Sequence, residues 1–243
     1  MPAAPPQPTA SMTAARNKGA FIDERQLNPR WPSQRSIDMT VTALATDART
    51  IYLARHGETE WNRIGRWQGA TDIPLSDTGR AQARLLAEAL RHKRIARVHA
   101  SHLSRALETA QIIAARLGVP APVTDPRLRE RGYGAFEGLT RVECAERYPG
   151  VWERYLADRR AVPPGAEPQA EVVERITTAM TEIATAAGAP SGSDAILVIS
   201  HGGTIRSFIH ATVGVIPPPL ENGALFRIRF EDGAFVSAEQ EQG

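Results

Sequence analysis

Two histidines lie at the ends of two strand-like apolar runs of the sequence, and each histidine is followed by glycine. His56 comes after TIYLA and one arginine, and His201 comes after DAILVIS. Both runs are short and rich in β-branched or aliphatic residues, which predicts buried strands. Because ligands of open α/β sheets bind beyond the carboxyl ends of the strands, the matched pair predicts a functional site at that edge. A packed or capping role is the alternative for either histidine taken alone.

Arginines accompany these histidines. Arg55 immediately precedes the first one, and Arg105 falls in the first turn of a predicted helix that follows a third strand end. Guanidinium groups bind oxyanions through paired hydrogen bonds. Backbone N–H groups at a helix start near Gly203 would add positive charge, and Asn62 could donate one more hydrogen bond. The combination predicts a phosphate-binding site.

A metal site is the competing interpretation of paired histidines. It would require carboxylates beside them, and neither motif supplies a matching set. His99 and His102 have the spacing of a ligand pair, but their arginine and serine neighbours indicate surface histidines. We therefore expect no metal.

Strand-like and helix-like segments alternate from residue 50 onward. The helix predicted over 75–93 has Ser76 as its N-cap, and Leu85 and Leu86 are among the apolar residues that recur at helical spacing, which predicts one apolar face. The next helix ends at Gly118. The alternation predicts an α/β fold in three layers, with a mostly parallel central sheet and helices on both faces. The predicted strands are 50–54, 96–101, a short one near 121–124, 194–200 and a closing hairpin of 225–230 and 234–239; the predicted helices are 75–93, 103–118, short helices in 139–160, 169–188 and 204–214.

The first 48 residues differ from the rest of the chain. They are rich in proline, alanine and small polar residues, so residues 1–48 are expected to be a disordered extension and residues 49–243 the folded domain. The extension lacks the apolar core of a secretory signal. Translation from Met1 or from Met39 stays open.

Composition limits the function classes. A net charge of +2 and the lack of a long basic run argue against nucleic acid as a partner, and no apolar run is long enough to cross a bilayer. The one cysteine, Cys144, cannot form an internal disulfide, which favours a reducing compartment, most simply the cytoplasm. A homodimer stays open.

Six motifs in this order resemble the histidine phosphatase superfamily, the phosphoglycerate mutase-like proteins, in its broad-specificity phosphatase branch. The resemblance covers nearly everything from residue 50 to the end. His102 and Pro168 depart from the family pattern, and neither departure removes a catalytic group. The motifs are RHGETEWN (55–62), WQGATDIPLSDTGRAQA (67–83), SHLSRALETA (101–110), LRERGYGAFEG (128–138), PPGAE (163–167) and ISHGGTIR (199–206).

The resemblance implies a role for each matching residue. His56 would be the nucleophile that forms a phosphohistidine, and Glu130 would protonate the leaving alcohol and then activate water. Gly202 would belong to the substrate-binding residues, while Thr59 would contact phosphate or cap its turn. Glu137 would be a structural partner. The groups that hold the phosphoryl oxygens would be Arg55, Arg105, Asn62 and His201.

The implied activity is metal-independent hydrolysis of a small phosphorylated metabolite, with no cofactor. The alternative is a phosphoglycerate mutase, which would need a 2,3-bisphosphoglycerate primer. Glycolytic mutases carry an extra segment that covers the site, and the compact stretch between Glu130 and His201 favours a phosphatase. A non-catalytic phosphate-binding regulator is a third interpretation, which the intact catalytic positions disfavour. Residues 133–165 are expected to form a small helical lid that selects the substrate.

Overall fold

The computed structural model describes residues 48–158, 161–186 and 188–241. The predicted disordered extension, residues 1–48, therefore lies outside the described residues except for its last position. No helix in the described part of the chain is long and apolar enough to cross a membrane.

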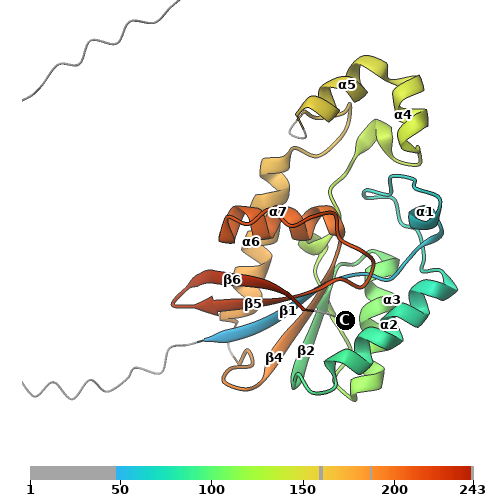
Figure 1. The fold of residues 1–243 in the computed structure, drawn as a ribbon. Coiled ribbons are helices and arrows are strands. Elements are labelled where there is room, and N and C mark those ends of the chain that lie inside the picture. The colour runs from blue at the N-terminus through green and yellow to red at the C-terminus, as the bar shows by residue number, and fades with distance from the viewer. Residues whose placement is uncertain (1–47, 159–160, 187, 242–243) are drawn as a thin grey trace, which may run out of the picture. The chain divides into compact units, whose positions relative to one another are not determined.

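One six-stranded mixed sheet forms the centre of the fold, with the strand order β3-β2-β4-β1-β5-β6 (Figure 1). The first four strands in this order run parallel, and the last two form the predicted antiparallel hairpin. Arg55 pairs with Ser200 in the register of β1 and β4, so the two central strands end level with each other. The bounds are β1 (Arg49–Arg55), β2 (Ile95–Ala100), β3 (Val123–Thr124), β4 (Ala195–Ser200), β5 (Leu225–Glu231) and β6 (Ala234–Glu241).

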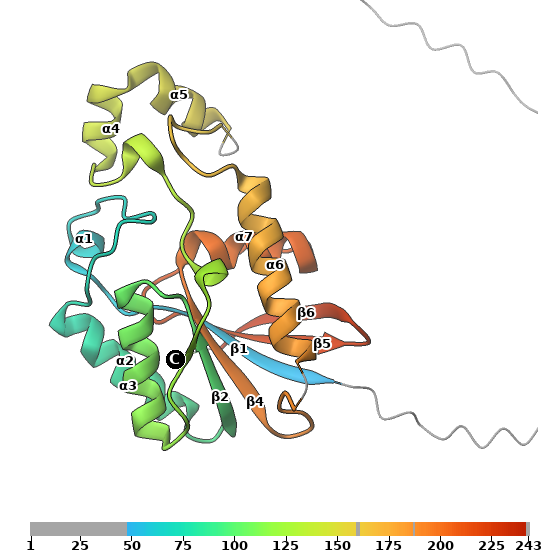
Figure 2. The same cartoon turned by 180° about the vertical axis from the view of Figure 1, so that it is seen from behind.

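Helices cover both faces of the sheet, as predicted (Figures 1 and 2). Successive side chains of a strand point to opposite faces, so β1 contributes to two cores. Ile51 and Leu53 pack in the core that includes α6 (Gln169–Thr185) and α7 (Gly202–Val213), and Tyr52 and Ala54 pack in the core of α2 (Asp77–Leu90) and α3 (Ser104–Leu117). This arrangement confirms the three-layer α/β fold.

The ends of α2 and α3 agree with their predicted caps. The Ser76 hydroxyl accepts a hydrogen bond from the Gly79 amide at the start of α2, and Gly118 ends α3 with a left-handed φ of 68°. The expectation for Leu85 was wrong, because this side chain is 71% exposed. Its neighbour Leu86 faces the core instead, since it lies in line with Ala83 and Leu90 on the helix surface.

In the segment predicted as a lid, residues 133–165, the described residues up to 158 include short helices that extend beyond the sheet (Figure 1). Phe136, Trp152 and Tyr155 pack there in a small aromatic core that is separate from the two cores of the sheet. The rings of Phe136 and Trp152 meet edge to face with centroids 5.7 Å apart. The short helices around the lid and the site are α1 (Glu60–Arg63), η2 (Pro126–Leu128), η3 (Gly134–Phe136), α4 (Arg141–Arg147) and α5 (Pro149–Ala157).

Candidate active site

His56 is the first residue after β1, and its environment defines the state of its ring. The backbone amide of His56 donates to the Ser200 carbonyl on β4 at 3.1 Å, and its Nδ1 lies 2.6 Å from the Gly57 carbonyl oxygen. A carbonyl oxygen only accepts hydrogen bonds, so Nδ1 carries the proton. The lone pair therefore lies on Nε2, where it can act as a nucleophile.

His201 lies beside His56, with ring centroids 5.0 Å apart. Burial holds the pKa of both histidines well below the ordinary value, and the nearby guanidinium groups of Arg55 and Arg105 lower both further. Both rings are consequently neutral near pH 7, which the nucleophilic role of His56 requires.

These lowered pKa values predict how stability changes with pH. The unfolded chain binds protons at its histidines below about pH 6.5, whereas the folded protein keeps His56 and His201 neutral there. Acid therefore favours the unfolded state, and the free energy of unfolding is expected to fall as the pH drops below about 6.5. Above that pH these two groups add no pH dependence.

Thermal melting between about pH 7.5 and pH 5.5 measures this effect. The melting temperature of the wild type should fall over this interval, and it should fall less for His201→Gln, which lacks one buried imidazole. An equal fall in the two proteins would show that the buried ring of His201 does not contribute.

The turn after His56 requires glycine because two backbone segments touch there. A Cβ at Gly57 would lie 2.4 Å from the Gly79 carbonyl oxygen at the start of α2. The Gly57 amide also donates to the Thr109 hydroxyl of α3 at 3.1 Å. Helices α2 and α3 thus fix the backbone that presents the nucleophile.

Gly57→Ala is expected to lower the free energy of unfolding by about 1–3 kcal/mol, because the added methyl group would force these backbones apart. Chemical denaturation measures the change. Gly150→Ala is the matched control: its Cβ would meet only Arg154 Nη1, at 3.7 Å, within helix α5. A helical alanine there should raise stability by up to about 1 kcal/mol. Equal effects at both sites would contradict the steric argument.

The two arginines are held by carbonyl oxygens. Arg105 is 1% exposed and donates to the carbonyls of Gly69 at 2.8 Å and Thr71 at 2.9 Å, and Arg55 Nη1 donates to the Leu220 carbonyl. Burial lowers the pKa of Arg105 to about 10, so this side chain stays cationic at neutral pH. Arg55 lies against Gly202, where a Cβ would be 3.4 Å from its Nε.

Several nitrogen atoms of this cluster are buried without a hydrogen-bond partner in the described part of the chain. They are the Nε atoms of Arg55 and Arg105 and both ring nitrogens of His201. Burying an unsatisfied polar group costs about 1–3 kcal/mol, and folded proteins rarely retain such atoms without a functional reason. The gathering of these nitrogens around His56 is therefore the strongest structural sign of an anion site.

Glu130 lies at the N-terminus of α7. Its carboxylate accepts hydrogen bonds from the backbone amides of Gly203, at 3.0 Å, and Thr204, at 2.9 Å. It also accepts one from the Thr204 hydroxyl at 3.0 Å. The helix start near Gly203 was expected to add positive charge to the site, and in the structure two of its amides donate to Glu130. A Cβ at Gly203 would lie 2.7 Å from Glu130 Oε1, so glycine permits this close approach.

Thr59 takes the second of its two expected roles. Its hydroxyl accepts from the Asn62 amide and donates to Asn62 Oδ1, both at 3.2 Å, and so caps α1. Asn62 itself lies beside the nucleophile, because Asn222 donates both to Asn62 Oδ1 and to the His56 carbonyl. Every residue predicted for the site is therefore in or next to one cluster.

The carboxylate of Glu137 is the structural partner that was expected. It accepts from the amides of Ala70 and Thr71, from the Thr71 hydroxyl and from the Tyr133 amide. The same loop supplies the carbonyls that hold Arg105. Glu137 thus joins the lid to the support of that arginine.

Two residues of the site were missed from the sequence. The Tyr133 hydroxyl lies near Gly203, and burial raises the pKa of this phenol well above its ordinary value, so it remains a neutral donor. Asn222 lies in the loop between α7 and β5, and it donates to the His56 carbonyl. In the sequence it forms part of ENGA, and an Asn-Gly pair is typical of an ordinary turn.

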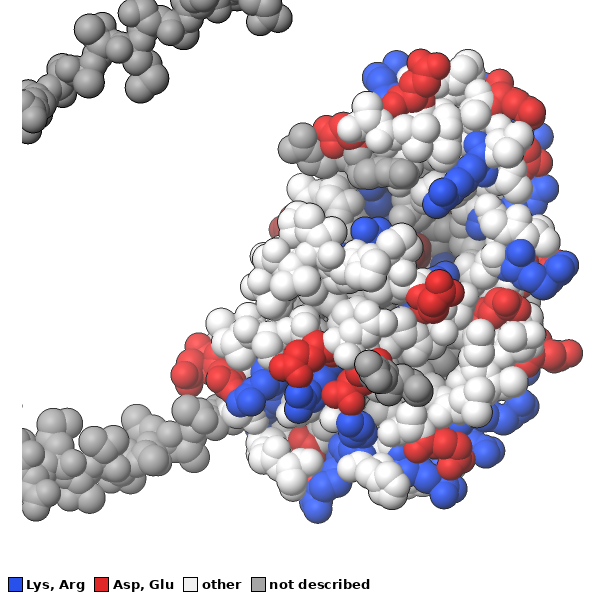
Figure 3. All heavy atoms as spheres, viewed as in Figure 1, with Lys and Arg blue, Asp and Glu red and all other residues white. Residues whose placement is uncertain are grey.

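The surface is hollowed between the lid and the body of the fold, with basic side chains around the hollow (Figure 3). The described residues contain no group of three or more His, Cys, Asp or Glu side chains that could hold a metal ion. Arg55 and Arg105 contribute positive charge beside His56 and His201.

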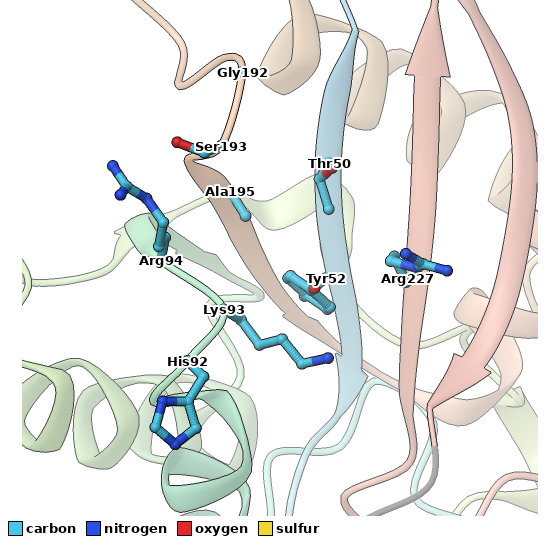
Figure 4. A pocket seen from close by; sticks show the side chains of 9 residues that line it. All are labelled: Thr50, Tyr52, His92, Lys93, Arg94, Gly192, Ser193, Ala195 and Arg227. Carbon is cyan, nitrogen blue, oxygen red and sulfur yellow. The ribbon is translucent and has the colours of Figure 1, made fainter.

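A separate hollow of about 230 Å³ lies near the starts of β1 and β4, at the opposite ends of these strands from His56 and His201 (Figure 4). It has a basic lining, but each of its lysine and arginine side chains is already paired with a carboxylate. We do not assign it a ligand. The pairs are Lys93–Glu241, Arg94–Asp194 and Arg227–Glu239.

Most of this chain is similar in sequence to known proteins. The profile of the histidine phosphatase superfamily (branch 1) matches residues 51–241. A phosphoglycerate mutase-like protein of Arabidopsis thaliana, phosphoglycerate mutase-like protein 4, is 40% identical over 164 residues, which are 66% of this chain and 70% of that protein. A metal-independent phosphoserine phosphatase of the same plant is 32% identical over 205 residues, 83% of each chain.

The fold of this chain is also similar to that of a solved phosphatase structure. The mycobacterial glucosyl-3-phosphoglycerate phosphatase in complex with VO3 superimposes with a TM-score of 0.70 at 26% identity, over 80% of this chain and 98% of that one. Because the family profile spans most of the sequence, from β1 to the last described strand, this chain belongs to the histidine phosphatase superfamily, branch 1.

Proposed function

We propose that this protein is a metal-independent phosphomonoesterase that hydrolyses a small phosphorylated metabolite through phosphorylated His56. The observation that carries the proposal is the tautomer of His56: Nδ1 donates to the Gly57 carbonyl, which leaves the Nε2 lone pair free beside buried, unpartnered arginine and histidine nitrogens. A nucleophile next to a ready anion site is the requirement for attack on a phosphate ester.

In the first step, Nε2 of His56 attacks phosphorus and the bond to the leaving oxygen breaks. Glu130, protonated at this stage, delivers its proton to that oxygen. Arg55, Arg105, His201 and Asn62 hold the equatorial oxygens, and Gly202 lies next to them at the start of α7.

In the second step, water attacks the phosphohistidine. The Glu130 carboxylate takes a proton from the water, the P–N bond breaks, and inorganic phosphate leaves with His56 neutral again. The arginines supply the charge that a metal ion provides in other phosphatases. The relative named as a metal-independent phosphoserine phosphatase supports this reading.

The lid bears on the choice between hydrolysis and transfer. A mutase must shield its phosphohistidine from water, and here the chain between Glu130 and His201 forms η3, α4, α5, α6 and β4 with no further described helix over the site. This favours hydrolysis. We also propose a cytoplasmic location, which the single cysteine favours because a reducing compartment keeps a free thiol reduced.

Phosphate release from a panel of phosphomonoesters in EDTA, with 3-phosphoglycerate and phosphoserine included, tests the proposal. A mutase assay primed with 2,3-bisphosphoglycerate runs in parallel. Release without isomerisation is the expected result. Isomerisation with little release would identify a mutase, and phosphate binding without either reaction would identify a regulator.

A further inference from the structure

Asn222 connects the nucleophile to a substrate-binding side chain. Its Nδ2 lies 3.1 Å from the His56 carbonyl oxygen and 3.1 Å from Asn62 Oδ1. Both partners accept, so the amide group of Asn222 uses both of its N–H donors there.

The orientation of the Asn62 amide follows from its neighbours. The Thr59 backbone amide can only donate, so the Asn62 atom that it contacts at 3.2 Å has to be the oxygen. The Thr59 hydroxyl and Asn222 Nδ2 donate to the same oxygen. The Asn62 Nδ2 group therefore points away from these donors, and it has no acceptor among the described residues.

The backbone around Asn222 is held by hydrogen bonds to β1, whereas Asn62 lies on a very short helix. The Gly223 amide donates to the Arg55 carbonyl at 3.2 Å, and the Arg55 amide donates to the Ala224 carbonyl at 2.9 Å, so the loop continues the pairing of β1 with β5. Asn62 lies on α1, a four-residue helix. So short a helix is marginal by itself and relies on contacts from elsewhere.

We propose that Asn222 is a positioning residue, which holds the Asn62 amide in register with His56 so that Asn62 Nδ2 donates to a phosphoryl oxygen. The inference rests on the proposed function in one respect, namely that phosphate binds beside His56. It assigns to Asn222 an action through Asn62 and no contact with the substrate.

A double-mutant cycle between Asn222 and Asn62 tests the inference, with the dissociation constant of inorganic phosphate measured by calorimetry and kcat/KM measured in parallel. Asn222→Ala should weaken phosphate binding about tenfold in the wild type, and less than about twofold in the Asn62→Ala background. Asn222→Leu keeps most of the volume without the donors and without a new charge, and it should match Asn222→Ala. Pro218→Ala, at an exposed position of the same loop, should bind as the wild type does.

Equal losses of Asn222→Ala in both backgrounds, or no loss, would overturn the inference. If circular dichroism shows that Asn222→Ala does not fold, the same cycle with Asn222→Leu decides. Because the binding measurement does not depend on turnover, a wild type that binds phosphate without hydrolysing esters would refute the proposed hydrolase and leave the cycle decisive. A wild type that does not bind phosphate would overturn both proposals.

Discussion

His56→Ala is expected to remove phosphomonoesterase activity, with kcat lower by a factor on the order of 10⁴ or more. The reason is chemical: the free Nε2 lone pair, fixed by the bond from Nδ1 to the Gly57 carbonyl, is the proposed attacking atom. Phosphate release at saturating substrate measures the loss. Rapid alkaline quenching of the wild type should also trap a phosphoryl group that is stable to base and labile to acid.

His210→Ala is the matched control, since this histidine is exposed on α7 and outside the cluster. It should keep the wild-type rate. Near-normal turnover of His56→Ala would show that the phosphohistidine mechanism is wrong, whereas loss of activity with a lowered melting temperature would call for the isosteric His56→Asn.

Glu130→Gln is the second change with a large expected effect. It removes the proposed proton donor, and kcat/KM for an alkyl phosphate should fall by about 10²–10⁴-fold. For p-nitrophenyl phosphate the loss should be at least about tenfold smaller, because a nitrophenolate leaves without a proton and kcat/KM reports the steps up to formation of the phosphoenzyme. The comparison of the two leaving groups separates acid catalysis from structure.

A control for structural damage is needed because Glu130 also accepts hydrogen bonds from two backbone amides in the first turn of α7. Glu146→Gln, an exposed change on α4, controls for loss of a carboxylate elsewhere. An equal loss with both leaving groups would contradict the role as acid and leave Glu130 as a cap of α7.

The sequence predicted those parts of the fold that depend on local pattern. The runs TIYLA and DAILVIS became the paired central strands β1 and β4, and their shared register placed His56 and His201 together. Ser76 and Gly118 acted as caps because capping depends on a few neighbouring residues.

The failures concern contacts made across the chain. The hydrogen bond from the Gly203 amide to Glu130 was not anticipated, because nothing local shows that Glu130 would reach this amide from another segment. Asn222 carried no periodic or motif signal, and only the pairing of β5 with β1 brings it to His56. For Leu85 the helix was correct and the face was wrong, since either of two adjacent leucines satisfies the period.

The separate aromatic core of the lid has a consequence for how such an enzyme can diverge. Phe136, Trp152 and Tyr155 pack against one another and do not belong to either of the two cores on the faces of the sheet. Energetic effects of changes at well-separated sites add independently. A lineage can therefore exchange lid residues other than Tyr133 and Glu137, which contact the site, and with them the substrate that the lid is expected to select, at little cost to the packing around the histidines. The matched relatives carry names for different phosphate esters on a shared scaffold, as such modular descent would produce.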